Sequence, residues 1–465
     1  MSKRFLGVTV MTEYAQNEGV DAVLDALAGA GVTAVTITPR VLEPSDAPGS
    51  FREPPIDAGE GKVRVLDRPL WGKHELSVRQ SPSYAPNRSL YNGCRYRPPE
   101  PDDLTANQGP VVAQLIRAAH ERHMRCYFQW VPGRPPGLSD EDRPRLPNGR
   151  LPRRSLAATA SLASPEVAAY NDALLRDLLE AYPDIDGFRP DWPEYPPYFL
   201  EDALVDFSPH AARAAEEMGF DFDWMRAAVA ELIAGLKGLP NATLEQWLMP
   251  DGGRYALAQA FLQNSPLLDW LRFKAALSRR TLARMRATID DAGKGPKLLE
   301  ANAFAPPFSV VSGLDFAGAA ESCDAFCPKL YAMHWSLIVK LYADQMIEWN
   351  PGLDEGLVTR SLVRFFDLAD ADGDYPLDQY GYPPPDKPHP VGPNPQRRKI
   401  AQVSAAVAGR AKVYPIVHSY GPAANFRERF ELALTSAADG VHINRYGYLS
   451  GEKLRIVGEL SREVH

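Results

Sequence analysis

Eight short runs of β-branched and aromatic residues, separated by segments with a helical spacing of apolar residues, constrain this chain more than any other feature. Strands that alternate with helices predict βα units and a parallel sheet. Eight such units are the number that closes a barrel. The sequence therefore predicts an α/β fold, a (β/α)8 barrel, with strands at residues 5–11, 34–38, 125–131, 185–191, 297–302, 325–331, 413–418 and 440–445.

Three connections between these runs are much longer than ordinary βα loops, and all three follow the C-terminal end of a strand. They cover residues 41–106, 192–270 and 336–398, approximately, after the second, fourth and sixth strands. Barrel enzymes build their substrate sites from loops at this end. We therefore expect residues 1–465 to form one barrel domain whose insertions wall an active site.

The amino-acid composition limits which ligands and partner molecules this chain is expected to bind. The chain has 51 basic and 59 acidic residues, a net charge of −8, which argues against nucleic acid or an anionic membrane surface and favours a small neutral or cationic ligand. The N-terminus runs into a strand pattern without a signal-peptide core, and no apolar run reaches membrane-spanning length, so a cytoplasmic protein is expected. Its four cysteines form no CxxC pair, and neither a metal nor a cofactor is expected. Composition leaves a homo-oligomer open.

The ends of the expected strands carry a polar and aromatic set at similar depth, which is where barrel enzymes place their active sites. Aromatic rings stack on sugars, and Asn, Arg, Gln and His side chains bond hydroxyl groups, so this set predicts a carbohydrate substrate. A phosphate site would instead show glycine-rich loops after the seventh and eighth strands, where only Gly421 and Gly447 stand. The expected substrate-binding residues are Glu13, Tyr14, Arg40, Gln129, Trp130, Arg189, Trp192, Asn302, Lys329, Tyr331, His334, Trp335, His418, Tyr420, Asn444 and Arg445.

The segment Gly187-Phe188-Arg189-Pro190-Asp191 ends the expected fourth strand, and Glu300 stands near the end of the fifth. It resembles the Gly-Phe-Arg-x-Asp segment of α-amylase-type glycoside hydrolases, whose Asp is the nucleophile and whose acid is a Glu on the fifth strand. The resemblance implies Asp191 as nucleophile and Glu300 as acid/base. Retention requires two carboxyls about 5 Å apart, one ionised and one protonated. Arg189 would keep Asp191 ionised, and a less polar setting would raise the pKa of Glu300.

The resemblance covers those five residues and the position of Glu300, and the Asn-His-Asp segment of α-amylases on the seventh strand is replaced by His418-Ser419-Tyr420. The chain is also similar to β-galactosidase-like barrels, through a helical segment that ends in Trp270-Leu271-Arg272-Phe273. Those enzymes carry catalytic Glu residues on strands four and seven. This similarity implies Glu194 as the acid, although the seventh strand ends in His418 and offers no carboxylate.

The leading prediction is a retaining glycoside hydrolase, with transglycosylation open, that cleaves a small glycoside or oligosaccharide. Two other functions remain open. Strand-end Glu, Asp and His residues also suit a metal-dependent sugar isomerase or epimerase. A non-catalytic carbohydrate-binding barrel would use the same aromatic residues without chemistry. Structural roles compete as well: Asp191 as a helix cap or ion-pair partner, Glu300 in an ion pair, and the tryptophans in the core.

Overall fold

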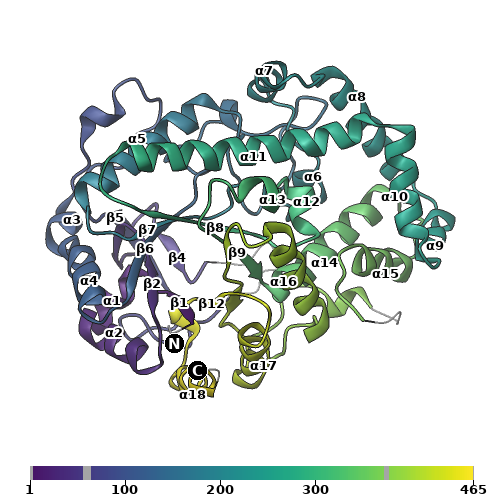
Figure 1. The fold of residues 1–465 in the computed structure, drawn as a ribbon. Helices are drawn as coiled ribbons and strands as arrows, with labels where there is room; N and C mark the ends of the chain where they lie inside the picture. The colour runs from purple at the N-terminus through teal and green to yellow at the C-terminus, as the bar shows by residue number, and fades with distance from the viewer. Residues whose placement is uncertain (1–3, 56–63, 371–375, 464–465) are drawn as a thin grey trace.

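Eight parallel strands close into a barrel in the computed structural model, which describes residues 4–55, 64–370 and 376–463. Each barrel strand pairs with the next, and the last pairs with the first, which confirms the expected (β/α)8 architecture (Figure 1). A short strand, β10 (Lys412–Val413), also pairs with β9. The barrel strands are β1 (Phe5–Thr9), β2 (Ala34–Ile37), β6 (Arg125–Trp130), β7 (Gly187–Pro190), β8 (Leu298–Phe304), β9 (Ala325–Leu330), β11 (Ile416–His418) and β12 (Gly440–Asn444).

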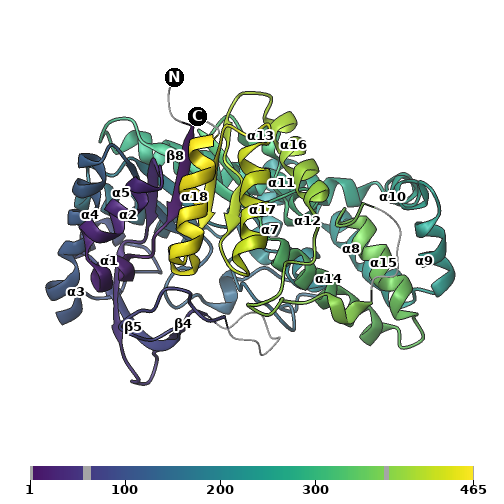
Figure 2. The ribbon, with the colours of Figure 1, turned by 90° about the horizontal axis from the view of Figure 1, so that it is seen from below.

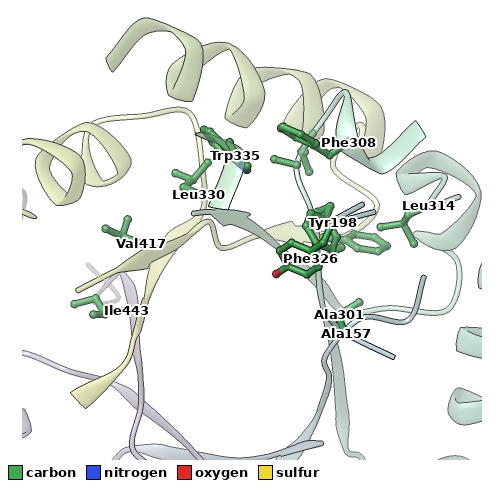
Figure 3. Packing of buried hydrophobic residues seen from close by; sticks show 14 of the residues in the cluster. Ala157, Tyr198, Ala301, Phe308, Leu314, Phe326, Leu330, Trp335, Val417 and Ile443 are labelled. Atoms are coloured by element: carbon green, nitrogen blue, oxygen red, sulfur yellow. The ribbon is translucent and has the colours of Figure 1, made fainter. Parts of the chain in front are cut away.

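The barrel strands are buried on both faces, as strands between a filled interior and a ring of helices must be. Outward-pointing side chains such as Leu330, Val417 and Ile443 pack under the surrounding helices (Figure 3). Inward-pointing residues alternate with them and fill the interior. This alternation fixes which residues of each strand can reach the open C-terminal end of the barrel, which we call the mouth.

Helices cover the outside of the barrel. The helix α5 begins at Pro165 because the Ser164 hydroxyl accepts a hydrogen bond from the Val167 N–H and proline suits the first helical turn. The chain ends on α17 and α18, which lie side by side against the barrel (Figure 2). The helices nearest the barrel are α1 (Thr12–Glu18), α2 (Val20–Gly29), α4 (Pro110–Glu121), α5 (Pro165–Ala181), α11 (Pro266–Asp291), α12 (Phe308–Ser312), α13 (Phe316–Ala319), α14 (Ala332–Trp349), α16 (Pro393–Val407), α17 (Ala423–Leu434) and α18 (Gly451–Glu463).

The segment after β2 forms a small antiparallel sheet in the order β3-β5-β4. Figure 2 shows this sheet at the end of the barrel opposite both chain termini, which is the mouth. It carries Arg40 at its first residue and Glu53 at the end of β4. Its elements and those that follow are β3 (Arg40–Pro44), β4 (Phe51–Glu53), β5 (Leu76–Pro82), η1 (Arg88–Tyr91) and α3 (Asp103–Gln108).

The segments after β7 and β9 are helical and pack against each other, with α15 on α9, at the right of Figure 1. A further long connection, residues 131–164 after β6, carries Arg134 to the mouth. Among the described residues, no helix combines the length and the apolar composition needed to cross a bilayer. The remaining elements are η2 (Asp140–Asp142), α6 (Leu200–Ala203), α7 (Pro209–Met218), α8 (Phe222–Lys237), α9 (Asn241–Leu248), α10 (Gly252–Gln263), α15 (Glu355–Phe365), η3 (Leu377–Gln379) and η4 (Tyr446–Tyr448).

Candidate active site

Several of the buried polar atoms that lack a hydrogen-bond partner within the described chain lie at the barrel mouth. Such atoms are rare in folded proteins, and each one calls for an explanation such as a bound ligand or water. Their concentration at the strand ends marks the mouth as the candidate active site. The atoms that form neither a hydrogen bond nor an ion pair there are both carboxylate oxygens of Glu13, Arg40 Nε, Trp192 Nε1, Glu194 Oε2 and Arg445 Nε.

Asp191 follows β7 and forms an ion pair with a lysine from a strand that is not its neighbour in the barrel. Lys329 Nζ, on β9, lies 2.6 Å from Asp191 Oδ1, and the lysine side chain is 3% exposed against 16% for the aspartate. The ammonium group also lies 4.7 Å from the centre of the Trp192 ring and 5.2 Å from that of Phe304. This arrangement fixes one oxygen of Asp191 on a buried cation and leaves Oδ2 for other contacts.

Glu194 lies three residues beyond Asp191 in a very different environment. Its side chain is buried, and Oε1 accepts a hydrogen bond of 2.7 Å from the Phe304 N–H. Burial raises the pKa of Glu194 to about 8, which Lys329 partly offsets and Asp191 adds to. The carboxyl is therefore protonated at neutral pH. Since Oε1 is the acceptor of the backbone bond, the proton belongs on Oε2.

Charged residues from β3, β4, α1 and the end of β12 form the opposite part of the mouth, and we call Glu13, Arg40, Arg445 and Glu53 the arginine side. Arg445 Nη2 is ion-paired with Glu53, and both side chains are nearly buried. Arg40 Nη1 donates to Gln80 Oε1 at 2.8 Å. Burial lowers the pKa of Arg40, Glu13 raises it and Arg445 lowers it, so the three charges lie close together.

Rings and imidazoles line the mouth between these two sides. The Tyr331 ring meets His334 and His418 edge to face, with centroids 5.3 and 5.0 Å apart. His334 Nδ1 lies 2.8 Å from the Tyr198 hydroxyl, and His418 Nδ1 accepts from the Tyr420 N–H at 3.1 Å. Burial, and then Arg64, hold the pKa of both histidines well below the usual range, so both are neutral near pH 7.

Beneath the mouth lies a fully buried polar floor centred on Arg189. Its guanidinium donates to Asn302 Oδ1 at 2.9 Å and to His442 Nδ1 at 2.6 Å. The bond to Nδ1 places the imidazole proton of His442 on Nε2, which then donates to Thr9 Oγ1 at 3.0 Å. Asn302 in turn donates to Gln129 Oε1 at 3.1 Å. Arg189 and Asn302 are therefore structural supports of the site, and Lys329 occupies the place beside Asp191 that the sequence predicts for Arg189.

The expectation that Glu300 stands at the end of the fifth strand is wrong. The strand β8 continues to Phe304, and Glu300 pairs in register with Ala325, the first residue of β9. Asp191 is level with Asn302, two residues or about 7 Å nearer the mouth. Glu300 Oε2 lies 3.5 Å from Arg189 Nη1, and burial raises its pKa. The structure thus places Glu300 in the floor and does not bring it together with Asp191 at the mouth.

Several aromatic residues expected to bind substrate have structural contacts instead. Trp335 lies on α14 outside the barrel wall, fully buried and stacked over Phe308 (Figure 3). Trp130 Nε1 donates to Asn171 on α5, and the Tyr14 hydroxyl donates to the Arg68 carbonyl. Tyr420 donates to the Pro383 carbonyl and so anchors the segment after β9. Trp192, Tyr331, His334, Asn444 and Gln129 keep partial exposure at the mouth.

The structure also brings residues to the mouth that strand-end reasoning misses. Phe304 and Tyr198 contact the Lys329 and His334 groups, and Arg134 lies 5.2 Å from the Trp192 ring. Glu53 and Arg64 come from the segment after β2. Only Phe304 has a usable sequence signal, since the apolar run of its strand continues past Asn302. The others lie in insertions whose paths the pattern of residues does not define.

A cavity of about 230 Å³ lies away from the mouth, on the outer side of the barrel between α5, α7 and α11. Its charged residues are paired with one another: Arg284 with Asp172 at 2.7 Å, and Arg280 with Glu217 at 3.3 Å. The unpaired atoms of the mouth have no counterpart there among the described residues. We therefore place the chemistry at the mouth. The described segments contain no group of three His, Cys, Asp or Glu side chains placed to hold a metal ion.

Comparison with known proteins finds similarity in fold alone. No protein-family model and no curated protein matches the chain. Among solved structures, a β-galactosidase from the psychrophilic Marinomonas ef1 matches 99% of this chain and 59% of its own, with a TM-score of 0.53 and 11% identity. A β-galactosidase from the Antarctic haloarchaeon Halorubrum lacusprofundi matches 99% and 58%, with a TM-score of 0.51 and 12% identity.

The chain thus spans about three fifths of the length of these β-galactosidases. The fold is a TIM barrel, which this chain shares with these two β-galactosidase structures. At 11 and 12% identity the likeness concerns the fold alone, and what the mouth does rests on its own residues.

Proposed function

We propose that this protein hydrolyses glycosidic bonds, with Glu194 as general acid and Asp191 as attacking carboxylate. One observation carries the proposal: two carboxyls three residues apart lie in different environments, one ion-paired with a lysine and the other buried against a backbone N–H. Asp191 is ion-paired with Lys329, whereas burial raises the pKa of Glu194 to about 8. Glycosidases need one carboxyl of each kind beside the scissile bond.

In the proposed first step, Asp191 Oδ2 attacks the anomeric carbon while Glu194 Oε2 gives its proton to the leaving oxygen. The bond between the anomeric carbon and that oxygen breaks, and a glycosyl ester of Asp191 forms. A water molecule then attacks the same carbon, Glu194 takes up its proton, and the Asp191 carboxylate leaves. Net retention of the anomeric configuration follows, and a sugar hydroxyl in place of the water would give transglycosylation.

The surrounding residues support these roles. Lys329 fixes Asp191 Oδ1, so the attacking oxygen has a defined direction. The Phe304 N–H fixes Oε1 of Glu194, which keeps the proton on Oε2, an atom without a hydrogen-bond partner among the described residues. Trp192 keeps partial exposure beside both groups and offers a ring face to a sugar. The floor of Arg189 and Asn302 supports the ends of both strands from below.

The test compares Asp191→Ala and Glu194→Gln with wild type on a panel of glycosides. Replacing a general acid costs about 10²- to 10⁴-fold for substrates with poor leaving groups and much less for dinitrophenyl glycosides, which leave without a proton. Glu201→Gln is a matched control, because Glu201 is also buried but lies on α6. NMR of the first product reports the anomer. Wild-type turnover that survives both substitutions would disprove the assignment. Sugar binding without any wild-type turnover would favour a non-catalytic carbohydrate-binding barrel.

A further inference from the structure

The arginine side of the mouth holds two guanidinium groups with unused donors. Arg40 Nη1 is bonded to Gln80, while its Nε has no hydrogen-bond partner within the described chain. Arg445 Nη2 is ion-paired with Glu53, and its Nε likewise lacks a partner among residues whose positions are described. In both residues, therefore, the side of the guanidinium that carries Nε has a free donor. That side binds carboxylates in a planar, directional way.

Two like charges held together and partly desolvated are unfavourable unless something offsets them. Glu13 is fully buried in this group and is close enough to raise the pKa of Arg40. Within the described part of the chain, neither carboxylate oxygen of Glu13 forms a hydrogen bond, so Glu13 balances the charge of the arginines without occupying their donors. Glu13 is thus a positioning residue, and the donors of Arg40 and Arg445 remain for a ligand.

We propose that the arginine side binds the carboxylate of an acidic sugar, so that the substrate is a saccharide containing a uronic acid residue. This inference rests on the proposed glycosidase function. It departs from the neutral or cationic ligand expected from the net charge of −8, because a ligand at the mouth meets the local arginines before the distant surface charge. The Asp191 and Glu194 pair stands at the end of the fourth strand, and the arginine side at the ends of the first, second and eighth.

A carboxylate fits these residues better than a phosphate does. Phosphate sites of barrels use glycine-rich loops after the seventh and eighth strands, whose N–H groups point at the ligand. Here Gly447 packs so closely on Tyr14 that an added Cβ would lie 2.3 Å from the Tyr14 hydroxyl. A Cβ added at Gly421 would lie 3.1 Å from His389 Nε2. Neither glycine opens a backbone cradle, so the anion must be held by side chains.

Calorimetric titration of the intact protein tests the proposal without requiring turnover. The probes are glucuronate, galacturonate, glucose, galactose and glucose 6-phosphate, each titrated at low and high salt. We expect the uronates to bind at least about tenfold more tightly than the neutral sugars, with an affinity that falls as salt rises. Equal binding of uronates and neutral sugars, or tightest binding of the phosphate ester, overturns the proposal. This selectivity is measured on the wild type, so it does not depend on any variant folding.

Variants locate the site. Arg40→Gln should weaken uronate binding about tenfold or more and leave binding of neutral sugars unchanged. Arg40→Lys should restore only part of the lost uronate binding, because lysine lacks the planar guanidinium fork. Arg122→Gln is the control: Arg122 follows α4, outside the arginine side, and its guanidinium is ion-paired with Asp21 and Asp25 on α2. Unchanged uronate binding in Arg40→Gln contradicts the assignment. If the protein binds uronates but cleaves no glycoside, the glycosidase function alone is refuted. If it cleaves neutral glycosides but does not bind uronates, this inference alone is refuted.

Discussion

The two sides of the barrel mouth differ in how their charges are satisfied. On the side of Asp191, a carboxylate and an ammonium group lie 2.6 Å apart, and the neighbouring carboxyl of Glu194 has one oxygen bonded to a backbone N–H. On the arginine side, Glu13 and Arg40 influence each other electrostatically without a hydrogen bond between them. The first side is organised before any ligand arrives, whereas the second retains donors and acceptors for one.

The two sides correspond to the two tasks of the proposed enzyme site, which are to change covalent bonds and to recognise a ligand. Groups that change covalent bonds must be held in fixed positions and protonation states, which demands tight partners within the protein. Groups that recognise a ligand must keep some of their bonding capacity unused. The buried unpaired atoms of the arginine side and the fixed charges at Asp191 follow that division. The predictions below test whether the division holds, in order of decreasing functional effect.

The largest effect is expected for Lys329→Met. The substitution leaves Asp191 without its cation in a mostly buried position, which should cost about 3 kcal/mol of unfolding free energy. Losing the fixed position of Oδ1 should also lower kcat/KM about 100-fold. Urea denaturation and steady-state kinetics measure the two effects. The control is Lys340→Met, whose partner Asp344 lies at a similar 2.7 Å but on a more exposed helix face, so less than about 1 kcal/mol is expected.

The second prediction concerns pH. Because the pKa of Glu194 is raised to about 8, the acid is protonated below that pH, and kcat/KM should fall as pH rises through 8. The same shift affects stability. The folded state binds a proton that the unfolded state releases near its ordinary pKa, so stability from this group is full at low pH and is lost as pH rises toward 8. Denaturation at pH 5 and pH 9 should show this loss in wild type and not in Glu194→Gln. If kcat/KM of Glu194→Gln still fell as pH rises through 8, the titration would belong to another group.

A smaller effect is expected for Glu53→Gln, which removes the carboxylate already bound to Arg445. If the arginine side recognises an anion, freeing Nη2 should tighten uronate binding about threefold to tenfold. Calorimetric titration with glucuronate measures it, and thermal unfolding records the cost of leaving Arg445 without its partner. Weaker binding in this variant would mean that Glu53 orients Arg445 and does not compete for it.

The smallest functional effect is expected for Glu300→Gln and Trp335→Phe. Both side chains lie outside the mouth, one in the floor and one behind the barrel wall. Turnover should remain within about threefold of wild type, while the unfolding free energy falls by about 1–3 kcal/mol. Kinetics and urea denaturation of the same samples measure both. A large loss of turnover in Glu300→Gln at unchanged stability would return Glu300 to the catalytic chemistry.

The barrel could be predicted from the sequence because its signal is local and repeated. Runs such as 325–331 and 440–445 are short and carry an apolar residue at every second position, and α5 begins at Pro165 after the Ser164 cap, which is also a local feature. Site prediction depended on a finer quantity, the depth of each residue within its strand. An error of two residues at the end of β8 moved Glu300 from the mouth to the floor. A shift of that size is within the ordinary uncertainty of strand ends, yet it decides which side chains meet a substrate.

The sequence by itself determined the order of strands and helices and the presence of Asp191, Glu194 and Lys329 near strand ends. Only the tertiary structure decided which of these charges meet. Asp191 and Lys329 come from strands that are not neighbours, and Arg445 and Glu53 come from opposite ends of the chain. Closing the barrel sets those distances, and distance together with burial sets the protonation state of each group. Neither quantity is encoded in a residue's own neighbours along the chain.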